Sequence, residues 1–301
     1  MINIKPLLNN IRLCKAVTGL SPKELQSLLP AFSESLTRYS FVVKPKAKRQ
    51  RKLGGGRRGH LPTVMDKLVF VLMYLKTYPT FDVMGFLTGR QRSKCQYSVA
   101  NLLPVLEMAL GKHLVLPKRK ISSPEEFFKL FPEIKEVFID GTERRTQKPK
   151  NLKKRNKLYS GKKKATTRKT VIVSDEKRRI LLLSPTKSGR RHDKRVADKF
   201  NIVSSIPQEV TAWTDTGFQG IQHIHPNTVM PKKASRGKPL TPAEKADNKV
   251  ISGIRIVSEH AIGGMKRLKA AADVYRNRLP NLDDTFSLLS AGIWNFHLQT
   301  A

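Results

Sequence analysis

The stretch that most constrains the fold of this chain runs from Glu136 to Thr142 and reads Glu-Val-Phe-Ile-Asp-Gly-Thr. Three consecutive apolar residues between a carboxylate and a glycine predict a buried strand that ends at Asp140 in a turn. The following segment, 143–169, holds thirteen Lys or Arg residues and a single acid, Glu143. A carboxylate beside such a cationic surface suggests a metal ion held next to a polyanion. The alternative is an Asp that only caps a turn, as Asp-Gly often does.

The charge of the whole chain indicates a polyanionic partner. With 58 basic and 23 acidic residues, the net charge is +35, and DNA or RNA is the simplest ligand that neutralises it. A membrane surface is the weaker alternative, because the longest apolar run, 68–75, is far too short to span a bilayer. The N-terminus has no signal-peptide pattern, and two cysteines cannot build a disulfide framework. We therefore expect an intracellular nucleic-acid-binding protein.

The N-terminal part is predicted to be helical. Ser21-Pro22-Lys23-Glu24 is a capping box with proline in the first turn, and it opens a helix within 19–39. The segment 44–60 combines clusters of Lys and Arg with three consecutive glycines. It is predicted to be a linker, either a solvated tether or one that follows the DNA backbone.

The segment 61–116 has the pattern of a helix-turn-helix. Helices are predicted over 62–78, over 81–87 and from 91 through 103, with Thr88-Gly89 between the last two. Gln and Arg near the start of the third helix are side chains that read base edges. An ordinary helical bundle is the alternative. The residues predicted to contact DNA here are Gln91, Arg92, Ser93, Gln96 and Tyr97.

From residue 117 onward, strands alternate with helices, which predicts an α/β domain. A hairpin is expected around Asp175, and a capping box at Thr241 opens a long helix. The predicted elements are a strand ending at 140, strands over 169–174, 179–184, 210–214 and 227–230, and helices over 193–204, 241–269 and 282–296.

Two further acids have contexts that suggest chemistry. Asp215 ends the predicted strand 210–214 and is followed by Thr-Gly, which repeats the arrangement at Asp140. Glu259 lies in a largely apolar part of the long helix, so we expect it at the edge of the core. Two glycines at 263–264 each cost about 1 kcal/mol of helix stability relative to alanine, which suggests a close approach there. The alternative for Glu259 is an ion pair with Arg255.

These three carboxylates suit phosphodiester chemistry. Two Mg²⁺ ions about 3.5–4 Å apart can activate an attacking oxygen and stabilise a leaving one, and such hard cations prefer carboxylate oxygens. Two strand-end aspartates and one helix glutamate would form a minimal site for the pair. The predicted cofactor is therefore two Mg²⁺ ions, with Mn²⁺ able to substitute.

Five motifs, taken together and in order, resemble the DDE transposases of the insertion sequence five group, and the eukaryotic Harbinger transposases are similar. The resemblance covers roughly 18–300. It implies an RNase H-like catalytic domain, with a mixed central sheet and flanking helices, preceded by an all-α helix-turn-helix domain. The motifs are Asp140 to Arg145, Tyr159 to Lys164, Gly189 with His192-Asp193, Asp215 to Gly220, and Arg255 through Glu259 to Lys266.

The resemblance implies a catalytic and metal-binding triad of Asp140, Asp215 and Glu259, Mg²⁺-dependent cleavage at transposon ends, and strand transfer of the freed 3′ hydroxyl. Ala165 and Phe218 stand where relatives commonly have His and Tyr, which affects DNA contacts rather than the triad. His192 and Asp193 would orient DNA or a metal ligand, or only cap the following helix.

The chain is thus predicted to have an N-terminal helical segment (1–43), a basic linker (44–60), a helix-turn-helix domain (61–116) and a catalytic domain (117–301). Expected partners are double-stranded DNA, both transposon ends and target, and further copies in a homodimer or larger synapse, with no membrane. The expected location is the cytoplasm and nucleoid of a bacterium, or the nucleus of a eukaryote. The remaining predicted DNA contacts are Arg144, Arg145, Lys162, Lys163, Lys164, Arg168, Lys169, Arg255 and Lys266.

Two alternatives use the same fold. A domesticated transposase could bind DNA without cutting it and act as a repressor or recruitment factor. Its usual mark is a lost acid, and none is lost here. A structure-selective nuclease is the other alternative, and it would nick DNA without releasing an element.

Overall fold

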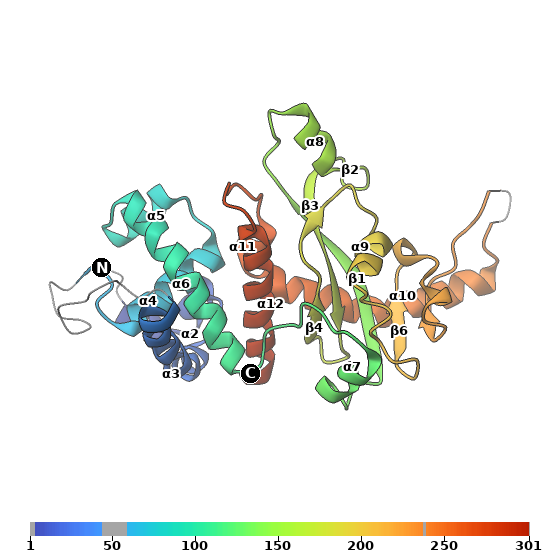
Figure 1. The fold of residues 1–301 in the computed structure, drawn as a ribbon, viewed down its shortest axis with the longest axis horizontal. Coiled ribbons are helices and arrows are strands. Elements are labelled where there is room, and N and C mark those ends of the chain that lie inside the picture. The colour runs from blue at the N-terminus through green and yellow to red at the C-terminus, as the bar shows by residue number, and fades with distance from the viewer. Residues whose placement is uncertain (1–3, 44–58, 237–238, 301) are drawn as a thin grey trace. The chain divides into compact units, whose positions relative to one another are not determined.

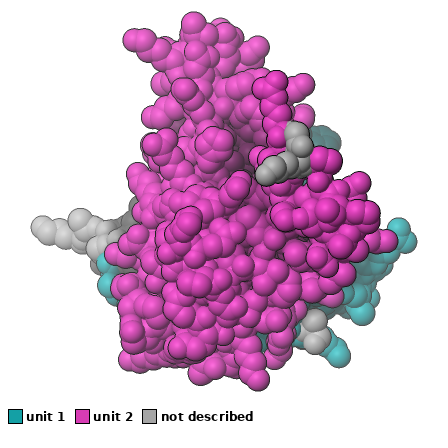
Figure 2. Space-filling view, turned by 90° about the vertical axis from the view of Figure 1, so that its right-hand side faces the viewer, with its two compact units in different colours: residues 1–116, 266–273, 285–301 teal, residues 117–265, 274–284 magenta. Residues whose placement is uncertain are grey.

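Figure 1 shows the computed structural model of the chain, which describes residues 4–43, 59–236 and 239–300. The predicted linker at 44–60 therefore lies almost entirely outside the described residues. The chain divides into two compact units, coloured separately in Figure 2. Unit 1 contains 1–116, 266–273 and 285–301, and unit 2 contains 117–265 and 274–284. No helix in the described part of the chain is long and apolar enough to cross a membrane.

Unit 1 is made of helices whose starts follow from local capping. Ser21 and Glu24 form the predicted capping box, and Thr63 with Asp66 forms a second one. Thr80 caps the next helix, which ends at Gly89 in the left-handed conformation. The helices are α1 (Ile4–Asn9), α2 (Ile11–Thr18), α3 (Pro22–Arg38) with the π-helical turn η1 (Tyr39–Val43), α4 (Val64–Thr77), α5 (Phe81–Thr88), α6 (Arg92–Lys112), α11 (Lys269–Ala272), and α12 (Leu282–Thr300) from 285 onward.

Helix α4 carries the core of unit 1. Every residue from 68 to 75 is buried, as expected for a helix that is apolar on all sides. Its Tyr74 ring stacks on Phe81 at 5.4 Å between centroids and lies 6.0 Å from Phe286 of α12. The sequence-based division assigned all of 117–301 to one domain, whereas in the structure 266–273 and 285–301 form one compact unit with the N-terminal helices. Periodicity marks α12 as amphipathic but does not say which core its apolar side joins.

Unit 2 contains a mixed sheet, so the predicted α/β class is confirmed for this part of the chain. The strand order is β2-β3-β1-β6-β7, and β4 and β5 also pair with β3. Strand β1 runs antiparallel to β3 and parallel to β6. The strands are β1 (Glu136–Arg145), β2 (Tyr159–Ser160), β3 (Ala165–Ser174), β4 (Ile180–Leu183), β5 (Lys187–Ser188), β6 (Thr211–Thr214) and β7 (Thr228–Val229).

Strand β1 is longer than predicted. It continues past Asp140 to Arg145, where it still pairs with Thr167 of β3. The antiparallel partner supplies hydrogen bonds beyond the point where β6 stops, so Asp-Gly does not end the strand. The predicted end at Asp140 is therefore wrong, although the parallel pairing with β6 does stop one residue earlier, at Ile139.

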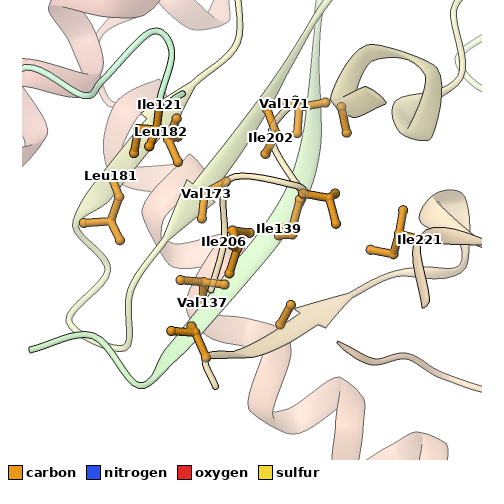
Figure 3. Close-up of a cluster of buried hydrophobic side chains, with 14 of the residues drawn as sticks. Ile121, Val137, Ile139, Val171, Val173, Leu181, Leu182, Ile202, Ile206 and Ile221 are labelled. Carbon is orange, nitrogen blue, oxygen red and sulfur yellow. The ribbon is translucent and has the colours of Figure 1, made fainter. Parts of the chain in front are cut away.

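An apolar cluster covers one face of this sheet (Figure 3). Val137 and Ile139 of β1 meet Val171 and Val173 of β3, with residues of the flanking helices packed over them. Because neighbouring strand residues point to opposite faces, Ile139 in this cluster places the side chain of Asp140 on the other face. The helices of unit 2 are α7 (Pro124–Leu130), α8 (Leu152–Leu158), α9 (Asp193–Lys199) and α10 (Pro242–Lys266), with short 3₁₀ turns η2 (Thr216–Phe218) and η3 (Ile221–His223).

The packing of α12 in unit 1 can be tested with Phe286→Ala. Phe286 is fully buried against Tyr74 and Tyr78, so its loss should lower the free energy of unfolding of unit 1 by about 3–5 kcal/mol. Urea unfolding followed by circular dichroism measures the change. The matched control is Phe86→Ala, because the Phe86 side chain is 88% exposed and its removal should cost less than about 0.5 kcal/mol. Equal effects of the two variants would contradict the placement of α12.

Candidate active site

The sheet brings two of the predicted catalytic residues together. Parallel pairing of β1 with β6 runs from Glu136 opposite Thr211 to Ile139 opposite Thr214. Asp140 and Asp215 are the next residue on each strand, so they lie side by side where β6 ends. The carboxyl ends of parallel strands are where open α/β sheets place their ligands. The two carboxylates are thus positioned by strand register rather than by loops.

Burial and like charge act on Asp140. The pKa of this carboxyl is raised to about 6: burial is the largest cause, and the negative charges of Asp215 and Asp193 add to it against the opposing influence of Arg255. The Gly141 N–H donates to Asp140 Oδ1 at 2.6 Å, which favours the ionised form. Asp215 Oδ1 accepts from the Gly217 N–H at 2.9 Å. Negative charge is therefore concentrated here, and a cation would relieve it.

Asp193 is a third carboxylate at this place, and it comes from the first turn of α9. A Cβ added to Gly141 would lie 2.4 Å from Asp193 Oδ1, and one added to Gly217 would lie 3.3 Å from Asp193 Oδ2. Asp193 therefore lies against Gly141, the residue after Asp140, and close to Gly217, the second residue after Asp215. His192 occupies the N-cap position, but its side chain makes no capping hydrogen bond. The acidic residue in the first turn, rather than His192, stabilises the start of the helix.

Glu259 is placed differently from the expectation. It is exposed on α10, where Ser258 and Ala261 are the buried neighbours, so the predicted position at the core edge is wrong. Of the two glycines at which a close approach was expected, Gly264 is buried, whereas a Cβ at Gly263 would meet nothing within 4 Å. Among the described residues, no three His, Cys, Asp or Glu side chains are grouped closely enough to hold a metal ion. The structure therefore assembles the two aspartates without Glu259.

A cleft of about 940 Å³ opens in unit 2 beside Asp193 and Asp215. Its lining also includes Tyr159 and Ser160 of β2. The predicted contact Lys162 lines it, while Asp140 and Glu259 do not. Four further cations were missed by the sequence reasoning, although the basic run around His192-Asp193 could have indicated three of them. These four residues are Arg190, Arg191, Lys194 and Lys233.

Three of the predicted DNA contacts are engaged inside unit 2. Lys169 is only 5% exposed and forms ion pairs with Glu143 and Asp193. Arg168 Nε lies 2.7 Å from Asp283, and the buried Arg144 lies over the ring of Tyr275. The structure gives these residues internal partners, which differs from the expected phosphate contacts. A run of charge in a sequence does not reveal which members face inward.

The other predicted contacts have accessible side chains. Arg255 and Lys266 of α10 are half-buried. In unit 1, Gln91 is the N-cap residue of α6, which extends to Lys112 rather than stopping at 103. The exposed contacts are Gln91, Arg92, Ser93, Gln96, Tyr97, Arg145, Lys162, Lys163 and Lys164.

Comparison with known proteins agrees with the predicted family. Residues 139–291 match the family described as DDE superfamily endonuclease. The chain is 30% identical over 262 residues to a protein of Microchaete diplosiphon named "Probable transposase for insertion sequence element IS702", covering 85% of this chain and 88% of the relative. No solved structure matches the chain.

The chain therefore belongs to the DDE superfamily endonucleases. Within that class, its similarity places it among the transposases of insertion sequences, which confirms the resemblance drawn from the motifs. DNA is the substrate of this class, and its members generally use divalent metal ions. Asp140 and Asp215 fit such an ion, because they offer adjacent carboxylate oxygens with excess negative charge.

The charge on Asp140 can be tested through the pH dependence of stability. Its raised pKa means that, between pH 3.8 and about 6, the folded chain binds this proton more tightly than the unfolded chain does. Stability is therefore lost as the pH rises through this window. Asp140→Asn should be more stable than the wild type near neutral pH, by about 3 kcal/mol, and this advantage should disappear towards pH 4.

Urea unfolding at a series of pH values without divalent metal measures this difference. The control is Asp247→Asn, which neutralises an exposed acid of α10. The difference in free energy of unfolding between this variant and the wild type should stay the same at every pH. A wild type that is as stable as Asp140→Asn near neutral pH would contradict the proposed charge excess.

Proposed function

We propose that this protein is an active DNA transposase that cleaves the ends of its element and joins the freed 3′ hydroxyl to target DNA. The observation that carries the proposal is the placement of Asp140 and Asp215 side by side where β6 ends, next to a cleft lined with cations. Family membership supplies the class of reaction. The lining of the cleft supports a polyanionic substrate at the same place.

The reaction needs two displacements at phosphorus. Water first attacks a phosphodiester at the element end, and the bond to the 3′ oxygen breaks. The 3′ hydroxyl then attacks a target phosphodiester and displaces another 3′ oxygen. Bound Mg²⁺ ions, or Mn²⁺ in their place, would activate the attacking oxygen and stabilise the leaving one. In this proposal Asp140 and Asp215 hold the metal in an RNase H-like domain, and no covalent enzyme intermediate is required.

Glu259 is the proposed third carboxylate. Arg255 lies one helical turn before it on the same face of α10, and the charge of Arg255 already acts on Asp140. Through Arg255, this face of α10 is therefore near Asp140. We propose that Glu259 joins the site when metal and DNA are bound, since catalytic contacts are often loose in ligand-free structures.

The remaining parts of the proposal concern DNA. Helices α5 and α6 are proposed to form the helix-turn-helix that reads terminal inverted repeats, with Gln91 and Arg92 at the exposed start of α6. Bringing two ends together requires at least two copies of the chain, so a dimer or larger synapse is proposed. The site of action is then wherever the element's DNA lies, which is the nucleoid in a bacterial cell.

The first test is cleavage of a labelled duplex that carries the element's own terminal inverted repeat, with Mg²⁺ or with EDTA. Asp140→Asn, Asp215→Asn and Glu259→Gln should each lower the cleavage rate at least about 1,000-fold, equivalent to roughly 4 kcal/mol of activation free energy. Binding of the same duplex should remain, because these changes remove no cation.

Glu176→Gln is the matched control, since Glu176 is an exposed acid in the turn between β3 and β4. Specific binding without cleavage in any divalent metal would favour a domesticated DNA-binding protein. Nicking of branched DNA without release of the element would favour a structure-selective nuclease.

The cations of the cleft can be tested by the salt dependence of DNA binding. If Lys162 and Arg190 contact phosphates, Lys162→Ala and Arg190→Ala should each weaken binding and reduce the slope of log K against log salt by about 0.9. Lys177→Ala is the control, because Lys177 is an exposed lysine of the β3–β4 turn. The measurement is fluorescence anisotropy of a labelled duplex at several salt concentrations. A slope that all three variants leave equal to the wild-type value would exclude the cleft as the DNA path.

A further inference from the structure

We propose that Asp193 is a positioning residue of the active site: held by Lys169 in the space left by Gly141 and Gly217, it fixes the two chain segments that carry Asp140 and Asp215. This inference rests on the proposed function, because it assigns Asp193 a role towards the proposed metal-binding aspartates. It also gives Lys169 a role other than a phosphate contact.

Two glycines make room for this one carboxylate. At Gly141 an added Cβ would lie 2.4 Å from Asp193 Oδ1 and 2.7 Å from its Cγ. At Gly217 it would lie 3.3 Å from Asp193 Oδ2 and 2.9 Å from Asp215 Oδ1. Neither glycine has the positive φ that would itself favour glycine. The space taken by Asp193, rather than backbone conformation, explains the glycine after Asp140, while at Gly217 the carboxylates of Asp215 and Asp193 together take the space of a side chain.

Lys169 holds Asp193 in that space. Its Nζ lies 3.0 Å from Asp193 and 3.2 Å from Glu143, and donates to the Arg191 carbonyl at 2.9 Å. Glu143 in turn accepts a hydrogen bond from the Thr167 hydroxyl at 2.6 Å. The Arg191 carbonyl thus accepts a hydrogen bond from the ammonium group, and the two carboxylates lie at ion-pair distance from it. These contacts connect β1, β3 and the start of α9, so the position of Asp193 is fixed relative to the sheet.

The contacts give Asp193 a direct route to both aspartates. The Gly141 N–H bonds to Asp140 Oδ1, and the Gly217 N–H bonds to Asp215 Oδ1. Asp193 lies close to the same two glycines whose amides orient the carboxylates of Asp140 and Asp215. If Asp193 moves, both amides are free to turn away from their acceptors. Loss of Asp193 should therefore weaken the hydrogen bonds of both Asp140 and Asp215 to these amides, even without metal or DNA.

The two glycine amides provide a measurement that does not depend on activity. The full chain labelled with ¹⁵N-glycine contains 18 glycines, few enough to follow amide hydrogen exchange residue by residue. In Asp193→Ala, the amides of Gly141 and Gly217 should exchange at least about tenfold faster than in the wild type, while the Gly253 amide keeps its rate. Tenfold faster exchange corresponds to a local opening that is about 1.4 kcal/mol easier, on the order of one lost hydrogen bond.

The matched control is Asp283→Ala. Asp283 is also a buried acid, and its cationic partner is Arg168. Arg168 is the neighbour of Lys169 in β3, so its side chain lies on the opposite face of the sheet from that of Lys169. Its loss should leave the two reporter amides unchanged relative to Gly253. If Asp193 served general stability alone, both variants would raise the exchange of all three amides alike, and this outcome would overturn the proposal.

A second variant keeps the proposal testable if Asp193→Ala does not fold. Gly141→Ala retains every acid but pushes a methyl group into the Asp193 carboxylate, so the Gly217 amide should again exchange about tenfold faster. Gly253→Ala is its control, because nothing lies within 4 Å of that Cβ. An unchanged Gly217 amide in Gly141→Ala would contradict the proposed contact.

Cleavage assays separate this inference from the proposed function. With Mn²⁺ and the terminal-repeat duplex, Asp193→Ala should cleave about 10–100-fold more slowly than the wild type. Normal cleavage by Asp193→Ala with unchanged amides would overturn the positioning role and leave the transposase proposal standing. A wild type that does not cleave, with amides that respond as expected, would overturn the transposase proposal alone.

Discussion

The parallel pairing of β1 with β6 is the constraint on which the candidate site depends. The pairing ends at Ile139 opposite Thr214, and the next residue on each strand is an aspartate. A slip of one residue would turn every side chain of β1 to the other face of the sheet. Burial of Val137 and Ile139 in the apolar cluster opposes such a slip. Core packing therefore fixes the register, and the register fixes the relative position of the two carboxylates.

Some charged side chains of unit 2 pair with one another inside the unit, and others stay available to a ligand. Several of its acids have cationic partners within the unit: Glu143 and Asp193 share Lys169, Asp175 pairs with Arg179, and Asp283 pairs with Arg168. In the described part of the chain, neither Asp140 nor Asp215 has a Lys or Arg within ion-pair distance. Arg255 offsets only part of the charge at Asp140, and in the proposed function a divalent metal would supply the rest. The remaining cations of the cleft stay accessible to a polyanion.

The sequence predicted best those features that are encoded locally. The capping box at Ser21, the hairpin around Asp175 and the long helix after Thr241 all occur as expected, because each depends on neighbouring residues. What it missed depends on contacts between distant segments. The antiparallel partner of β1 carries that strand beyond Asp140, and the core of unit 1 takes up α12. The Asp-Gly pattern does not show that β1 continues, and helical periodicity does not show which core α12 joins.

The site divides in the same way. Asp140 and Asp215 could be found because each follows a short predicted strand and has a glycine one or two residues further on, a signal contained in a few adjacent residues. Lys169 was assigned to DNA because it closes a basic run, and only its burial between Glu143 and Asp193 reveals an internal role. The carboxylate that Lys169 holds, that of Asp193, takes the space of a side chain at Gly141 and part of that space at Gly217, although the sequence alone presents both glycines as turn residues. The need for glycine at these two positions depends in part on Asp193, which belongs to another element, α9.

The difference between Glu259 and the aspartates follows from what carries each residue. Strand register holds Asp140 and Asp215 in place before any ligand binds, whereas Glu259 depends on the position and rotation of one helix. Helix α10 already presents Arg255 to Asp140, and its charge partly offsets the repulsion among the acids. A divalent metal on the aspartates would supply the same compensation more strongly. The metal would then weaken the need for Arg255 at Asp140 and favour the approach of a carboxylate one turn away. In the proposed function, the sheet therefore provides the part of the site that is formed before ligand binding, and α10 carries the residue that would join it afterwards.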